Sequence, residues 1–120
     1  MAKKTKDKID PILLSVFARA FRAITDEMSL SLEQTARSPI LCEAKDFVTG
    51  LYDAHGQMLE QTENLPILAF SLAPVCKYII RYFGDNIHPG DVIFHNDVFS
   101  MGNQNNDVAV FRPVFFKRKL

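Results

Sequence analysis

The sequence predicts an α+β fold in which a long N-terminal helix, a β-hairpin and a second helix are followed by further strands. Three observations support this. Apolar side chains recur at helical spacing through residues 11–37. Two strand-like segments flank an Asp-Ala-His-Gly turn at 53–56. A Pro-Gly turn at 89–90 precedes a short apolar strand. With 120 residues there is room for one domain. We expect residues 10–120 to form an incomplete domain.

The first helix is predicted to span residues 11–37. Asp10 is a good N-cap, and Pro11 stands at the first helical position, where its missing N–H costs nothing. The helix should end at Ser38-Pro39, because the residue before a proline is pushed out of the α region. At 1.5 Å per residue it would be roughly 40 Å long, which is long for so small a domain.

A hairpin should follow, with strands at 47–52 and 57–61, and with His55 as a solvated turn residue. Residues 62–70 are expected to form a connector that is broken at Pro66. A second helix should then run from Ser71, as its cap, to Phe83, with Gly84 stopping it.

The remaining strands are predicted at 92–95 and 108–116, pairing into one sheet, and Pro113 places the last one at an edge. No later segment of this sequence could cover or pair the apolar side chains of that strand. We therefore expect the chain to be part of a larger protein or to need a partner. The predicted core consists of Phe17, Phe21, Ile24, Met28, Phe47, Leu51, Leu59, Val75, Ile79, Val92 and Phe94.

Composition excludes several classes of protein. Hydrophobic residues make up 48% and charged residues 23%, and the formal net charge is zero, which argues against nucleic acid or an anionic membrane as partner. Residues 1–9 are expected to be a disordered basic N-terminus. No signal peptide and no apolar stretch of about 18 residues is evident. Cys42 and Cys76 are expected to be free thiols in a reducing cytoplasm.

The segment 95–107 is the leading candidate site. It holds six Asn or Asp residues, one Gln and one His, and it follows directly on a predicted strand. Asn and Asp favour turns, so an ordinary polar loop is one reading. The other is a binding loop, because strand ends are where scaffolds usually place functional groups. The side chains expected to line the mouth of a cleft are Asn96, Asp97, Asn103, Gln104, Asn106 and Asp107.

His95 ends the predicted strand and could act as an acid, a base or a ligand, although a histidine bonded to loop backbone is an alternative. Asp97 is also suited to capping the loop through local backbone bonds. We therefore group His95, Asn96, Asp97 and Asn106 as candidate substrate-binding residues, with both structural alternatives left open.

The order of motifs resembles the N-terminal region of the hydantoinase B family, which includes 5-oxoprolinase halves and subunits of acetone and acetophenone carboxylases. The resemblance covers about residues 9–116. It rests on Asp10-Pro11, Thr35-Ala36-Arg37-Ser38-Pro39, Asp46-Phe47, Tyr52-Asp53-Ala54-His55-Gly56, Gln61, Pro66, Pro89-Gly90-Asp91-Val92, Asn96-Asp97 and Asp107.

This resemblance implies a subunit of an ATP-dependent carboxylase or cyclic-amide hydrolase. It would act in a hetero-oligomer with a hydantoinase A-like partner, which would supply ATP and Mg. The isolated chain should be inactive, and it has no glycine-rich phosphate loop of its own. A stand-alone, non-catalytic assembly or docking module derived from the family is the alternative.

The resemblance also bears on a metal and on catalysis. Where many members carry metal-binding histidines, this chain has Asn64, Leu68 and Gln104, and imidazole is a far better ligand than an amide. No metal is therefore expected, with Glu63 and Asp107 as a weak alternative pair for a hard cation. Asp107, with Gln104 and Asn103 beside it, is the expected catalytic group, and the amides could serve an oxyanion.

Overall fold

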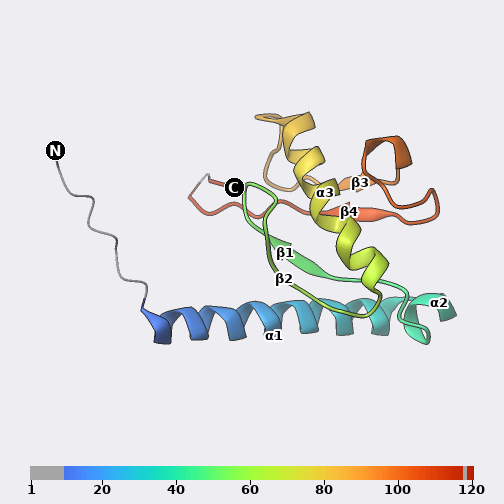
Figure 1. The fold of residues 1–120 in the computed structure, drawn as a ribbon, viewed down its shortest axis with the longest axis horizontal. Helices are drawn as coiled ribbons and strands as arrows, with labels where there is room; N and C mark the ends of the chain where they lie inside the picture. Colours follow the sequence, from blue (N-terminus) through green and yellow to red (C-terminus); the bar gives the residue numbers. More distant parts are fainter. Residues whose placement is uncertain (1–9, 118) are drawn as a thin grey trace.

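The computed structural model describes residues 10–117, 119 and 120. The predicted disordered N-terminus at 1–9 lies outside this range. Along the chain the structure has one long helix, a short helix, a strand pair, a third helix and a second strand pair (Figure 1). This is the α+β arrangement that the sequence predicts.

Helix α1, Pro11–Thr35, begins as its capping chemistry requires, because the Asp10 carboxylate accepts a hydrogen bond from the amide of Ile12 at 2.9 Å. It ends two residues earlier than predicted, where the Ala36 amide donates to the carbonyl of Leu32. A short helix that the sequence analysis did not predict, α2, Pro39–Cys42, follows with proline again at its first position.

Strands β1, Gly50–Tyr52, and β2, Met58–Gln61, form the predicted antiparallel hairpin. The Asp53 carboxylate organises its turn by accepting from the amides of His55 and Gln57, both at 2.8 Å. Gly56 takes the positive φ of 72° that the turn requires. A bulge between Leu51 and Tyr52 shifts the register.

Helix α3, Pro66–Phe83, begins earlier than predicted. Pro66 does not break a connector: it occupies the first helical turn, where a proline needs no partner for its nitrogen. Ser71 therefore lies inside the helix, where its hydroxyl donates to the carbonyl of Leu68 at 2.9 Å, and it caps nothing. Gly84, with φ of 52°, ends the helix as predicted.

The expectation that the chain lacks an 18-residue apolar stretch needs correction. Helix α3 is 18 residues long with a mean hydropathy of 1.2, which by length and composition suffices to cross a membrane. The helix nevertheless carries Lys77 and Arg81, and its Val75, Cys76 and Ile79 are buried in the fold. A core helix of a soluble protein has the same properties, so the finding is weak evidence for a membrane span.

Strands β3, Ile93–His95, and β4, Ala109–Phe111, pair antiparallel with Phe94 opposite Val110, in a sheet separate from the hairpin. The last strand is shorter than predicted, because it ends before Pro113, which cannot donate to a ladder. A single 3₁₀ turn, η1, Val98–Ser100, follows β3.

The core lies around α3, which stands above the hairpin and against the β3–β4 pair (Figure 1). Its buried apolar residues are Phe47, Ala69, Val75, Cys76, Ile79 and Ile87. Three predicted core residues, Phe47, Val75 and Ile79, are confirmed. Phe21 and Leu51 are only half-buried.

Six predicted core residues are wrong, with exposed fractions from 40% to 69%: Phe17, Ile24, Met28, Leu59, Val92 and Phe94. The physical reason is the orientation of their elements. Thr25 is the only buried residue of α1, and Ile24 and Met28 lie at the edge of its contact with the hairpin, where they line a hollow with Thr49 instead of being covered. In β3, Ile93 and His95 are the half-buried positions, so the alternation along the strand turns Phe94 outward.

Candidate functional site

The loop between β3 and β4 is built around Asp97. Its carboxylate accepts from the amide of Phe99 at 3.0 Å and from the hydroxyl of Ser100 at 2.6 Å, and so caps η1. The hydroxyl of Ser100, followed by the Phe99 amide, lowers the pKa of Asp97 below its usual range. Asp97 thus takes the structural role that the sequence analysis left open for it.

Gly102 closes the loop on Asp97. Its amide donates to the Asp97 carbonyl at 3.0 Å, and a Cβ at this position would lie 2.7 Å from that oxygen. Glycine is therefore needed here for close backbone approach. The preceding Met101 has a φ of 75°, a left-handed conformation that is uncommon for a residue other than glycine.

The three predicted catalytic residues come together within this loop. The Asp107 carboxylate accepts from the side-chain amide of Asn103 at 2.6 Å and from that of Gln104 at 3.0 Å. The Asp107 amide also donates to the Gln104 carbonyl. Asn103 and Asp107 are half-buried and Gln104 is exposed. Two amide donors thus orient one carboxylate at the loop surface.

The predicted substrate-binding residues lie less close together than the three predicted catalytic residues. The Asn96 side chain donates to the carbonyl of Asn105 at 3.0 Å, which ties the start of the loop to its far side. Asn106 is exposed.

His95 lies apart from the carboxylate cluster. Its ring packs edge-on against Tyr78 of α3, with the ring centroids 5.7 Å apart. Both ring nitrogens are buried and have no hydrogen-bond partner in the part of the chain that the structure describes. This histidine is therefore not the loop-bonded residue that the sequence analysis offered as the alternative.

The donor set of the loop does not fit a transition-metal site. An amide side chain stands at position 104, where an imidazole would be the better metal ligand, and it donates to Asp107. Among residues 10–117, 119 and 120, no three His, Cys, Asp or Glu side chains lie together as metal ligands would. Glu63 is exposed and makes no such group with Asp107.

A hollow of about 210 Å³ lies beside the loop and was not predicted from the sequence. It is lined by Pro74, Lys77, Tyr78 and Arg81 of α3 and by Met101 of the loop. The i, i+4 spacing of Lys77 and Arg81 was the available signal, but Met101 could not be placed beside them without the fold.

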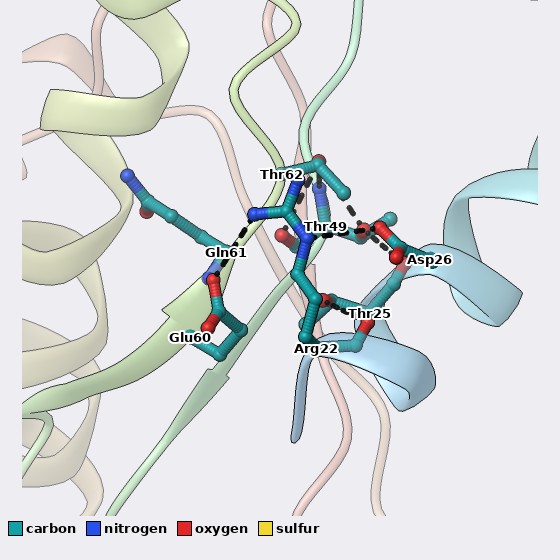
Figure 2. Close-up of polar contacts among 7 residues, drawn as sticks. All are labelled: Arg22, Thr25, Asp26, Thr49, Glu60, Gln61 and Thr62. Atoms are coloured by element: carbon teal, nitrogen blue, oxygen red, sulfur yellow. Dashed lines mark hydrogen bonds and ion pairs between the residues drawn. The ribbon is translucent and has the colours of Figure 1, made fainter. Parts of the chain in front are cut away.

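A second unpredicted feature is a polar seam between α1 and the hairpin, made by Thr25, Thr49 and Thr62 (Figure 2). The Thr49 hydroxyl donates to the Thr25 carbonyl at 2.9 Å and lies 3.3 Å from the Thr62 hydroxyl. All three threonines are buried. At its edge Arg22 contacts Asp26 at 3.4 Å and Glu60 at 3.5 Å.

A third contact joins the hairpin to α3. Gly56 is buried against Lys77, and a Cβ on it would lie 2.8 Å from Lys77 Cγ. Nearby, burial raises the pKa of Tyr52 to about 12 and that of the Cys76 thiol to about 11. Cys42 and Cys76 are both free, as expected, and the raised pKa makes Cys76 a poor nucleophile.

The chain is similar to several known proteins over nearly its whole length. The beta subunit of caprolactamase from Pseudomonas jessenii is 40% identical over 112 residues, which cover 93% of this chain and 19% of that subunit. 5-Oxoprolinase 1 of Arabidopsis thaliana is 27% identical over 118 residues, covering 98% of this chain and 9% of that protein. The 5-oxoprolinase of Saccharomyces cerevisiae is 30% identical over 107 residues, covering 89% and 8%.

The chain therefore spans about a fifth of the caprolactamase subunit and less than a tenth of these oxoprolinases. No solved structure matches it significantly. The model of the family described as hydantoinase B/oxoprolinase matches residues 10–120, which confirms the resemblance seen in the motifs. On this evidence the chain belongs to the hydantoinase B/oxoprolinase family.

Proposed function

We propose that this chain is part of a subunit of an ATP-dependent, cytoplasmic hydrolase that opens cyclic amides. The observation that carries the proposal is the Asp107 carboxylate, held by the amides of Asn103 and Gln104 in a loop of a hydantoinase B-family chain. The named relatives support hydrolysis over carboxylation, because caprolactamase and 5-oxoprolinase are both named for cyclic-amide substrates.

The chemistry of the loop suits the opening of an amide. A carboxylate that accepts two hydrogen bonds keeps further lone pairs, with which Asp107 can take a proton from an attacking water. Each side-chain amide nitrogen of Asn103 and Gln104 has a second N–H beyond the one given to Asp107. Those N–H groups can donate hydrogen bonds to the substrate's carbonyl oxygen and stabilise the negative charge that develops on it.

A hydantoinase A-like partner would supply ATP and Mg, so activity should require both chains. The caprolactamase relative is itself named as a beta subunit, which supports a hetero-oligomer. The residues present here support no metal-dependent step within this chain.

The proposal is tested by co-purifying the full-length subunit that contains this sequence with its hydantoinase A-like partner. ε-Caprolactam, 5-oxoproline and acetophenone are then supplied in separate assays with ATP and Mg, with and without bicarbonate. Product amino acid formed without bicarbonate, and only with ATP and both chains, is the expected result.

Product that appears only with bicarbonate and a ketone such as acetophenone would contradict the proposal and favour the carboxylase alternative. A complex that assembles fully but turns over none of these compounds would instead favour a non-catalytic docking role.

A further inference from the structure

The hollow beside the loop has the features of a small anion site. Its two cationic residues, Lys77 and Arg81, stand one helical turn apart on the same face of α3. Neither forms an ion pair within 4.0 Å with any residue that the structure describes, whereas Arg22 and Lys45 do. Two like charges at this spacing repel each other, and an anion bound between them would reduce that repulsion.

Lys77 is held in place more firmly than an ordinary surface lysine. Its Cγ and backbone lie directly against Gly56, which has no side chain to keep them apart. The hairpin turn thus fixes the stem of Lys77 while the ammonium stays exposed. Asp53 in the same turn is close enough for its charge to attract that of Lys77, but no ion pair within 4.0 Å joins the two side chains, and the Asp53 carboxylate accepts from the Gln57 and His55 amides. A charge that is positioned in advance loses less freedom when it binds a ligand.

The other walls of the hollow are apolar. They are Pro74 and the Tyr78 ring on the helix, and Met101 on the loop. Met101 is held at its unusual φ of 75° by the bonds that Asp97 makes to Ser100 and Gly102. Strained backbone of this kind persists only where the surroundings enforce it, and it is commonest at ligand sites. Helix α3 and the loop between β3 and β4 therefore form the two sides of this hollow.

We propose that this hollow binds the carboxylate of a small organic acid, with its charge between Lys77 and Arg81 and its carbon chain against Tyr78 and Met101. The volume of about 210 Å³ is below that of most drug-sized pockets and suits a chain of a few carbons. Opening a cyclic amide yields a carboxylate, so the product of the proposed reaction belongs to this class. That last link alone rests on the proposed function.

The test is a titration of the full chain with hexanoate, hexanamide and inorganic phosphate, followed by NMR at the Met101 methyl group and the Tyr78 ring. Hexanoate should shift both signals, and hexanamide, which has the same shape without the charge, should bind about tenfold more weakly. Replacing both Lys77→Gln and Arg81→Gln should weaken hexanoate binding about tenfold, and each single change about threefold. Arg19→Gln on α1 removes the same charge elsewhere and should change binding less than about twofold.

Equal binding of hexanoate and hexanamide, or unchanged affinity in the folded double variant, would overturn the proposal. Phosphate binding as tightly as hexanoate would also overturn it, because the apolar walls would then contribute nothing. Binding is measured without turnover. A chain that binds hexanoate in an assembly that opens no cyclic amide would refute the proposed function alone, and an active assembly without binding would refute the site alone.

Discussion

Thr49 and Thr62 exchange hydrogen bonds: the Thr49 amide donates to the Thr62 hydroxyl at 2.9 Å, and the Thr62 amide donates to the Thr49 carbonyl at 2.8 Å. This exchange continues the hairpin one step beyond the Gly50–Gln61 pair. The Thr49 hydroxyl then passes the network to α1 through the Thr25 carbonyl. A long helix is thus fastened to a short hairpin by buried hydroxyl groups (Figure 2).

Thr49→Val should lower the free energy of unfolding by about 0.5–1.5 kcal/mol, because it removes the buried hydrogen bond that the Thr49 hydroxyl donates to the Thr25 carbonyl. Urea unfolding followed by circular dichroism measures this. Thr35→Val is the matched control, since the Thr35 hydroxyl is exposed and bonds to the Ser31 and Leu32 carbonyls of its own helix. Its cost should stay within about 0.5 kcal/mol. Equal losses for the two variants would show that the seam contributes no special stability.

Gly56→Ala should cost about 2–4 kcal/mol, the sum of a left-handed alanine and a clash with Lys77. Gly84→Ala separates the two causes, because Gly84 also has a positive φ, of 52°, but a Cβ there meets nothing within 4 Å. Gly84→Ala should therefore cost only the strain of its backbone at φ 52° and ψ −122°, about 1–3 kcal/mol. Thermal unfolding of both variants gives the comparison. A cost for Gly56→Ala no greater than that for Gly84→Ala would mean that the turn moves away from α3 easily.

Stability should fall in alkali because of Cys76 and Tyr52. Burial raises the thiol pKa from 9.0 to about 11 and, chiefly for the same reason, the phenol pKa from 10.0 to about 12. Both groups are neutral when protonated, so the folded chain keeps protons that the unfolded chain releases. Their contribution is complete below pH 9 and is lost as the pH rises toward 11 to 12.

Urea midpoints at pH 7, 9 and 10.5 measure this alkaline effect. In the Cys76→Ala, Tyr52→Phe double variant the decline between pH 9 and 10.5 should be clearly smaller. A double variant that declines as steeply as the natural chain would place the alkaline sensitivity in other groups.

Asp107→Ala should lower product formation in the full assembly by at least about a hundredfold, as expected for loss of a general base. ATP turnover by the partner should remain measurable. Asp85→Ala, on an exposed aspartate between α3 and β3, is the control and should leave product formation unchanged. Full activity of folded Asp107→Ala would mean that the loop is structural and that the reaction occurs elsewhere.

Local chemistry accounts for what the sequence predicted correctly. The Asp10 cap, the 53–56 turn and the Gly84 stop depend on neighbours within a few residues, and each stands where the sequence placed it. Asn103, Gln104 and Asp107 met for the same reason, since all three lie in one loop. The prediction for Pro66 was wrong because proline can either interrupt a helix or begin one, and the residues that follow it decide which.

What the sequence could not predict depends on contacts between distant segments. Phe17 and Phe94 have the spacing of core residues, but burial also requires a facing element, and the described residues leave half or more of each side chain exposed. The threonine seam carries no apolar period, so hydrophobic periodicity does not reveal it. The hollow joins Tyr78 to Met101 across more than 20 residues of chain, and no local pattern links the two.

The threonine seam also sets the rotational phase of α1. Apolar contacts tolerate small slips, but a hydroxyl that must reach one carbonyl does not, and each residue of an α-helix turns the axis by about 100°. If α1 advanced by one residue, the Thr25 carbonyl would swing away from Thr49 and the bond between them would break. The direction in which Phe17, Ile24 and Met28 point therefore depends on the polar contact between Thr25 and Thr49. Any surface that packs against that stripe therefore meets it at an angle set by the hydrogen bond from the buried Thr49 hydroxyl to the Thr25 carbonyl.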